Sequence, residues 1–150
     1  MISQYVSVLD ACVLTPMPVV DTLLRLAEAE RPFYTPQWSA QILGESAMVS
    51  GYESLIPAMT NHPGDRHIPA VAVKCGADSI VSDNTRHFPP ESLAPYGLEC
   101  FSADRFLAHL YHLDPAAFTG ILLEQARDIE RTLPQLLARH VPSLSKLIRE

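Results

Sequence analysis

Four acidic side chains are spaced along the chain so that they could share one pocket: Asp10, Glu45, Asp65 and Asp83. Carboxylates brought together raise one another's pKa values unless a cation lies among them. Mg²⁺ and Mn²⁺ prefer carboxylate and water oxygens as ligands, and such an ion can activate a water molecule for attack on a phosphodiester. The pattern therefore predicts a site for metal-assisted hydrolysis that needs no nucleophilic side chain.

Two of these acids directly follow predicted strands. Residues 5–9 are β-branched and apolar and end at Asp10, and residues 79–82 (SIVS) are a second predicted strand that ends at Asp83. In a parallel sheet the carboxyl ends of the strands meet at one edge, where sites usually form. We therefore expect both carboxylates at the same edge of a parallel sheet.

The other two acids belong to predicted helices. A helix is expected over residues 37–48, with Glu45 on its apolar face, where an unpaired charge is costly and a bound cation would satisfy it. A further helix is expected over residues 65–75, opened by Asp65. Because this helix precedes a parallel strand, it should begin at the sheet edge that carries the first two acids.

The remaining elements complete a pattern of alternating strands and helices. In the first part of the chain we expect a loop over 15–18, a helix over 19–30 and a short strand over 32–36. Gly76 is expected to end the helix over 65–75 in the left-handed conformation. We then expect a strand over 98–101 and helices over 102–113 and 114–131, with N-caps at Ser102 and Asp114. This order predicts an α/β fold with a central, mostly parallel sheet. Residues 1–150 are interpreted as one domain, with 114–150 as a C-terminal helical extension.

The amino-acid composition argues against several classes of protein. The chain has 150 residues, 47% of them hydrophobic, and a net charge of −6, which weighs against a protein that coats DNA. No apolar run is long enough to cross a bilayer, and the first residues do not resemble a signal peptide. Three cysteines without a C-x-x-C pair predict small buried side chains rather than disulfides or zinc ligands, as expected for a cytoplasmic protein.

Structural roles compete with the catalytic interpretation. An aspartate after a strand or before a helix is more often a helix cap or a turn residue. A phosphatase that uses Asp10 as nucleophile is disfavoured, because that chemistry wants a second aspartate at the position of Cys12. Four basic residues near the predicted pocket are either phosphate contacts to RNA or solvated surface charges: Arg66, His67, Arg86 and His87.

Taken in order, four short segments resemble the PIN domain, in particular the VapC-like toxin ribonucleases of bacterial type II toxin–antitoxin systems. The segments are residues 8–14 (VLDACVL), 42–45 (ILGE), 65–68 (DRHI) and 76–84 (GADSIVSDN), followed by Phe88 and Pro89. The resemblance implies a three-layer α/β/α fold and an endoribonuclease that binds Mg²⁺ or Mn²⁺ through Asp10, Glu45, Asp65 and Asp83. It also implies an RNA substrate, a small antitoxin protein as partner and a homodimer.

Three departures from that family pattern favour an alternative. The stretch between Glu45 and residues 51–53 is shorter than in similar proteins, Pro69 lies early in a predicted helix, and His87 stands where an acid is frequent. The alternative is a catalytically degenerate PIN-like module that binds RNA or protein.

Overall fold

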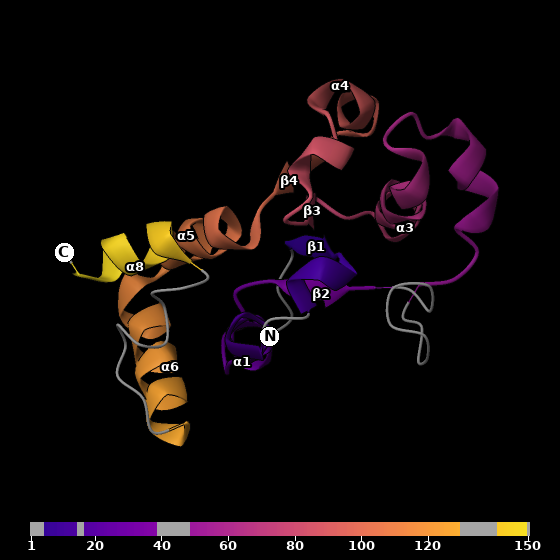
Figure 1. Ribbon diagram of the computed structural model, residues 1–150. Coiled ribbons are helices and arrows are strands. Elements are labelled where there is room, and N and C mark those ends of the chain that lie inside the picture. The colour runs from indigo at the N-terminus through magenta and orange to yellow at the C-terminus, as the bar shows by residue number, and fades with distance from the viewer. Residues whose placement is uncertain (1–4, 15–16, 39–48, 130–140, 150) are drawn as a thin grey trace.

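The centre of the fold is a four-stranded, wholly parallel sheet. The computed structural model describes residues 5–14, 17–38, 49–129 and 141–149. The strands are β1 (Val6–Leu9), β2 (Thr35–Gln37), β3 (Ser79–Val81) and β4 (Glu99–Phe101), in the order β2-β1-β3-β4 (Figure 1). Across the three strand pairings, Val8 of β1 lies beside Gln37 of β2 and Ile80 of β3, and Ile80 lies beside Cys100 of β4. The predicted parallel sheet is confirmed.

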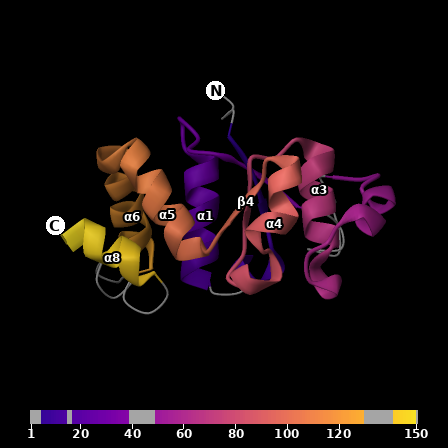
Figure 2. The same ribbon diagram turned by 90° about the horizontal axis from the view of Figure 1, so that it is seen from above.

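Helices cover both faces of this sheet (Figures 1 and 2). One layer contains α1 (Met17–Glu28), α5 (Ala103–Leu113), α6 (Pro115–Asp128) and α8 (Pro142–Arg149), and the other contains α3 (His67–Cys75) and α4 (Pro90–Leu93). Short 3₁₀ turns lie at η1 (Ala11–Leu14), η2 (Glu53–Ala58), η3 (Pro63–Asp65), η4 (Thr85–His87) and η5 (Ala94–Tyr96). The molecule is thus an α/β/α sandwich, as predicted.

The two layers follow from the alternation of side chains along the inner strands. Neighbouring residues of a strand point to opposite faces, so Val8 and Ile80 pack into the core beneath α3 and α4. Leu9 and Val81 pack into the other core, together with α1, α5, α6 and α8. All four of these side chains are fully buried, which explains why the strands read as continuous apolar runs rather than alternating ones.

Two polar side chains, one on α6 and one on α5, form hydrogen bonds that connect the helices of the layer containing α1, α5, α6 and α8. Gln125 of α6 is fully buried, where its Oε1 accepts a 2.7 Å hydrogen bond from the Thr22 hydroxyl of α1 and its Nε2 donates to the Pro18 carbonyl at 3.1 Å. The Asp104 carboxylate of α5 accepts hydrogen bonds from the first backbone N–H groups of α8, those of Ser143 and Leu144, both at 3.1 Å.

The predicted helix ends are confirmed where local chemistry determines them. The Ser102 hydroxyl accepts from the Arg105 N–H at 3.2 Å, and the Asp114 carboxylate accepts from the Ala117 N–H at 3.1 Å. Gly76 ends α3 with φ of 67°, in the left-handed region that favours glycine.

Several predicted boundaries are wrong. Helix α1 begins at Met17 rather than after the predicted loop, because Pro18 lies in the first turn, where its missing N–H is not needed. Gln37 does not begin a helix but is the last residue of β2, paired with Val8. The rest of that predicted helix, residues 39–48, lies outside the described residues.

Two further differences concern helices α3 and α4. The helix expected to open at Asp65 begins instead at His67, and Asp65 ends a 3₁₀ turn before it. Pro69 lies in the first turn of α3 and is compatible with it. Helix α4 was not predicted. Within the described residues, no helix is long and apolar enough to cross a membrane.

Candidate functional site

Asp10 is fixed at the carboxyl end of β1. Its backbone N–H donates to the Val81 carbonyl at 3.0 Å, which extends the pairing of β1 with β3 by one residue. The side chain is only 7% exposed, and its Oδ2 accepts a 2.7 Å hydrogen bond from the Ser82 hydroxyl. A carboxylate this buried is costly unless it is well partnered, so the sheet itself holds Asp10 in one orientation.

Cys12 lies beside the same carboxylate. Its Sγ is 3.5 Å from Asp10 Oδ2 and 3.4 Å from Ser82 Oγ, and it accepts a hydrogen bond from the Asp83 N–H at 3.3 Å. Burial raises the pKa of the Cys12 thiol, and its hydrogen bonds with the Ser82 side chain and the Asp83 backbone act in the opposite direction. The side chain is half-buried rather than the fully buried small hydrophobe that was predicted, and it connects the ends of β1 and β3.

Asp83 follows β3 at the same edge of the sheet. Its side chain is exposed, and its Oδ1 accepts a 3.0 Å hydrogen bond from the backbone N–H of Ala103, the first residue of α5. The next backbone N–H, that of Asn84, donates to Ser82 Oγ at 3.1 Å. Asp10 and Asp83 therefore lie at the carboxyl edge of neighbouring parallel strands, as predicted, and Asp83 also serves the start of a helix.

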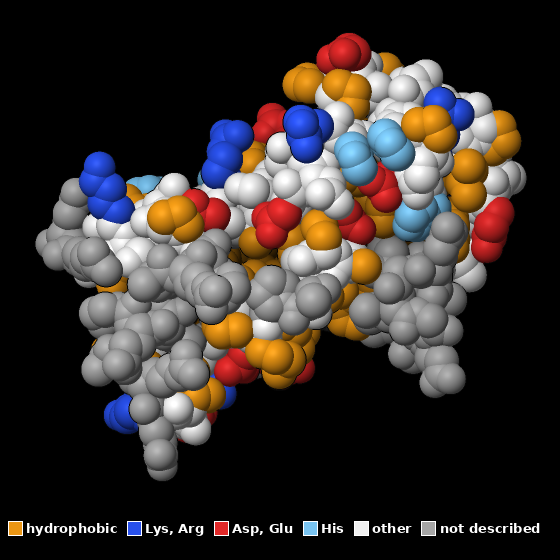
Figure 3. Space-filling model, in the orientation of Figure 1, with side chains coloured by type: hydrophobic (Ala, Val, Ile, Leu, Met, Phe, Trp, Pro, Cys, Tyr) orange, Lys and Arg blue, Asp and Glu red, His pale blue; other side chains and the backbone are white. Residues whose placement is uncertain are grey.

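Asp65 approaches this edge from the turn before α3. Its Oδ2 lies 2.5 Å from Nδ1 of His87, and the His87 ring stacks on the His62 ring with centroids 4.0 Å apart and planes 13° apart. The Asp65 and His87 side chains are 21% and 34% exposed. Figure 3 shows His and acidic side chains next to one another on this face of the molecule.

A histidine, His67, follows Asp65 by two residues. It is the first residue of α3 and is half-buried, and burial lowers the pKa of its imidazole. The negative charges of Asp65 and Asp10 act in the opposite direction. Asp65 contacts His87, which lies in the turn that follows Asp83, so Asp65 is on the same side of the sheet as Asp10 and Asp83.

The structure thus brings three of the four predicted acids to one region. Asp10 and Asp83 both contact Cys12, and Asp65 contacts His87 in the turn that follows Asp83. Glu45 lies outside the described residues. The donors that the described part of the chain offers here are carboxylate oxygens, a thiol and imidazole nitrogens.

Sequence reasoning missed the histidines of this region. His67 and His87 were weighed as phosphate contacts or solvated charges, whereas both are partly buried and His87 contacts the Asp65 carboxylate. His62 was not singled out, although the order His62, Asp65, His67 within a Pro-Gly turn is an available signal. Ser82 carried no signal in the sequence, because a serine at the end of a strand is common.

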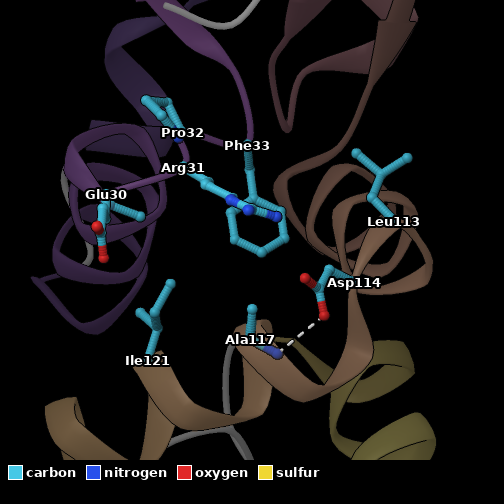
Figure 4. Close-up of a pocket in the computed structure, with 9 residues that line it drawn as sticks. Glu30, Arg31, Pro32, Phe33, Leu113, Asp114, Ala117 and Ile121 are labelled. Atoms are coloured by element: carbon cyan, nitrogen blue, oxygen red, sulfur yellow. Dashed lines mark hydrogen bonds between the residues drawn. The ribbon is translucent and has the colours of Figure 1, made fainter. Parts of the chain in front are cut away.

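A separate cavity lies at the other end of the sheet. It measures about 540 Å³ and is lined by Ala29, Glu30, Arg31, Pro32, Phe33, Leu113, Asp114, Ala117 and Ile121 (Figure 4). These residues belong to the segment that leads into β2 and to the junction of α5 and α6. The Asp114 carboxylate there is bonded to the Ala117 N–H, so the cavity does not contain the acidic constellation.

Comparison with known proteins gives a relative among the curated proteins. The chain is 38% identical over 92 residues to a Mycobacterium tuberculosis protein named "Putative ribonuclease VapC50". The match covers 61% of this chain and 54% of that protein, so the chain spans about half the length of the curated relative it matches. No family model matches the chain. No solved structure matches it either.

Proposed function

We propose that this chain is a Mg²⁺- or Mn²⁺-dependent endoribonuclease of the PIN-domain, VapC-like type, which hydrolyses RNA phosphodiester bonds. The observation that carries the proposal is the placement of Asp10 and Asp83 at the ends of adjacent parallel strands, with Asp65 on the same side. The similarity to a protein named as a ribonuclease supports the same activity.

The residues present fit a hard divalent cation. The Asp10 carboxylate is 7% exposed, and its contacts from Ser82 and Cys12 are hydrogen bonds that leave its charge uncompensated. A buried carboxylate of this kind is best stabilised by an opposite charge, and oxygen ligands select Mg²⁺ or Mn²⁺. We propose Asp10, Asp65 and Asp83, with Glu45, as the residues that hold the ion.

The side chains around the ion have separate roles in the proposal. When bound, the ion supplies an activated water and stabilises charge on the phosphodiester. Ser82 orients Asp10 through its 2.7 Å hydrogen bond, and a group that orients a ligand in this way commonly tunes affinity and activity. Burial lowers the pKa of His67, which disfavours its charged form beside the proposed site.

The biological setting belongs to the same proposal. The motif resemblance supports a cytoplasmic toxin of a toxin–antitoxin pair, with a small antitoxin protein as partner and a homodimer as the assembly. A co-purified or neighbouring small partner that suppresses the activity would support this setting.

A binding module without cleavage is the second candidate, and one observation favours it. The Asp83 and Asp65 carboxylates already have protein partners, the Ala103 N–H and the His87 imidazole.

Incubation of the purified chain with a mixed RNA pool in Mn²⁺, in Mg²⁺ and in EDTA distinguishes the nuclease from the binding module. The nuclease predicts cleavage with either metal and none in EDTA, whereas the binding module predicts retained RNA that stays intact under all three conditions.

A further inference from the structure

Three side chains at the turns before α3 and after β3 form a cluster of a different chemical type. One ligand atom from each of His62, Asp65 and His87 lies within 4.8 Å of the others. The His87 and Asp65 side chains are in direct contact, and the two imidazole rings stack nearly in parallel. Zn–N and Zn–O bonds of about 2 Å impose a spacing of roughly 3 Å between ligand atoms, so side-chain rotations would have to close the remaining separation.

The backbone holds this cluster together. The His62 N–H donates to the His87 carbonyl at 3.1 Å, which joins the turn before α3 to the turn after β3. The Asp65 N–H donates to the His62 carbonyl at 2.9 Å, which closes the 3₁₀ turn between them. Ligands carried by segments fixed in this way need little ordering when a cation binds.

Asn61 provides a second, independent observation. Its side chain is 2% exposed, and its Nδ2 donates to the Asp65 carbonyl at 3.1 Å. Its Oδ1 is buried and has no hydrogen-bond partner among the described residues. A buried amide oxygen without a partner costs about 1–3 kcal/mol, and here it lies directly beside the cluster in sequence.

We infer that His62, Asp65 and His87 form a binding site for a late first-row divalent cation such as Zn²⁺ or Co²⁺. Two imidazoles and one carboxylate are a donor set for such ions, whereas Mg²⁺ prefers oxygen ligands alone. Nδ1 of His62 accepts a 3.2 Å hydrogen bond from the Gly64 N–H at an exposed turn, and an ion bound at this nitrogen would replace that hydrogen bond. The site rests on the proposed function only in that both use Asp65. A cation bound here would draw Asp65 away from the carboxylate centre, which is the site proposed above at Asp10, Glu45, Asp65 and Asp83.

The test is a titration of the metal-free full chain with Co²⁺, followed by visible absorption, and with Zn²⁺, followed by calorimetry. The expected result is one saturable site per chain with a d–d band typical of nitrogen and oxygen ligands. His62→Gln and His87→Gln should each weaken binding at least about tenfold, the lower limit found when even a supporting group around a metal is lost. His112→Gln, an exposed histidine of α5, is the matched control and should bind as the wild type does.

Asp10→Asn distinguishes this site from the carboxylate centre. Co²⁺ binding that survives Asp10→Asn and is lost in His62→Gln supports the inference. Binding that is lost in Asp10→Asn but kept in His62→Gln would place the cation among the carboxylates and overturn it, as would the absence of any saturable Co²⁺ binding. Circular dichroism verifies that each variant is folded, and the exposed His62 makes its variant the safest in this respect. Failure of Mg²⁺-dependent RNA cleavage would overturn the proposed function alone.

Discussion

The Ser82 hydroxyl donates a 2.7 Å hydrogen bond to Oδ2 of Asp10 across two neighbouring strands. Ser82 is fully buried, and its own backbone N–H is bonded to the Phe101 carbonyl at 2.8 Å. The sheet therefore fixes the position of the Ser82 hydroxyl, and the hydrogen bond in turn fixes the orientation of the Asp10 carboxylate.

Replacing Ser82 by alanine should lower metal-dependent RNA cleavage about 10- to 100-fold, the usual effect of losing a group that orients a metal ligand. The measurement is the initial cleavage rate as a function of Mn²⁺ concentration, which should show weaker activation by the metal. Ser79→Ala is the matched control, because Ser79 is a buried serine of the same strand bonded to Ser7 rather than to Asp10. Equal rates for the two variants would contradict an orienting role for Ser82.

Asp83 has two roles that substitution can separate. Its Oδ1 accepts from the Ala103 N–H at the start of α5, and asparagine keeps that acceptor while removing the charge. Asp83→Asn should therefore retain the free energy of unfolding but lose cleavage, whereas Asp83→Ala should lose cleavage and also about 1 kcal/mol of stability. Urea denaturation together with the cleavage rate measures both effects. Full activity in Asp83→Asn would show that Asp83 is a helix cap only.

Gln125 joins α1 and α6 from a fully buried position. Gln125→Ala removes one of the two acceptors near the Thr22 hydroxyl, the other being the Pro18 carbonyl, and it removes a donor to that carbonyl. We therefore expect a loss of about 1–3 kcal/mol in the free energy of unfolding. Urea denaturation gives the value. Glu124→Ala, at the exposed neighbouring position of the same helix, should change stability by less than about 0.5 kcal/mol. Similar values for both variants would rule out this contact as a source of stability.

Cys100 makes stability depend on pH in the alkaline range. Burial raises the pKa of its thiol from 9.0 to about 12, with the Asp10 charge acting in the same direction. Between these two values the unfolded chain loses the proton and the folded chain keeps it, so this contribution to stability is complete below pH 9 and is lost as pH rises towards 12. The free energy of unfolding should therefore fall less steeply with pH in Cys100→Ala than in the wild type. Burial also raises the pKa of Tyr34, so some slope remains in the variant; identical slopes would contradict the assignment to Cys100.

The sequence was sufficient to predict the sheet and two of its acids because both depend on local patterns. The apolar runs before Asp10 and Asp83 specify buried strands, and parallel order then places both carboxylates at one edge. Caps at Ser102 and Asp114 were predictable for the same reason, since each involves a backbone N–H three residues away.

Relationships between distant segments were not predictable in this way. The contact of Asp65 with His87 spans 22 residues and depends on how two turns pack, so His87 was weighed as a surface charge. Gln37 continued an apparent helical pattern, yet pairing with Val8 placed it in a strand, because tertiary pairing overrides local propensity. Glu45 lies outside the described residues, and its role stays a prediction.

The most direct test of the proposed nuclease is the cleavage rate of Asp10→Asn on a mixed RNA pool in Mn²⁺, measured beside the wild type and Asp78→Asn. Asp78 is a suitable control, because it is an exposed aspartate that precedes β3 and accepts a hydrogen bond from the Val6 N–H at the opposite edge of the sheet. The account predicts that Asp10→Asn loses at least about 100-fold in rate while remaining folded, and that Asp78→Asn cleaves as the wild type does. Cleavage by Asp10→Asn at the wild-type rate would contradict the assignment of the active site.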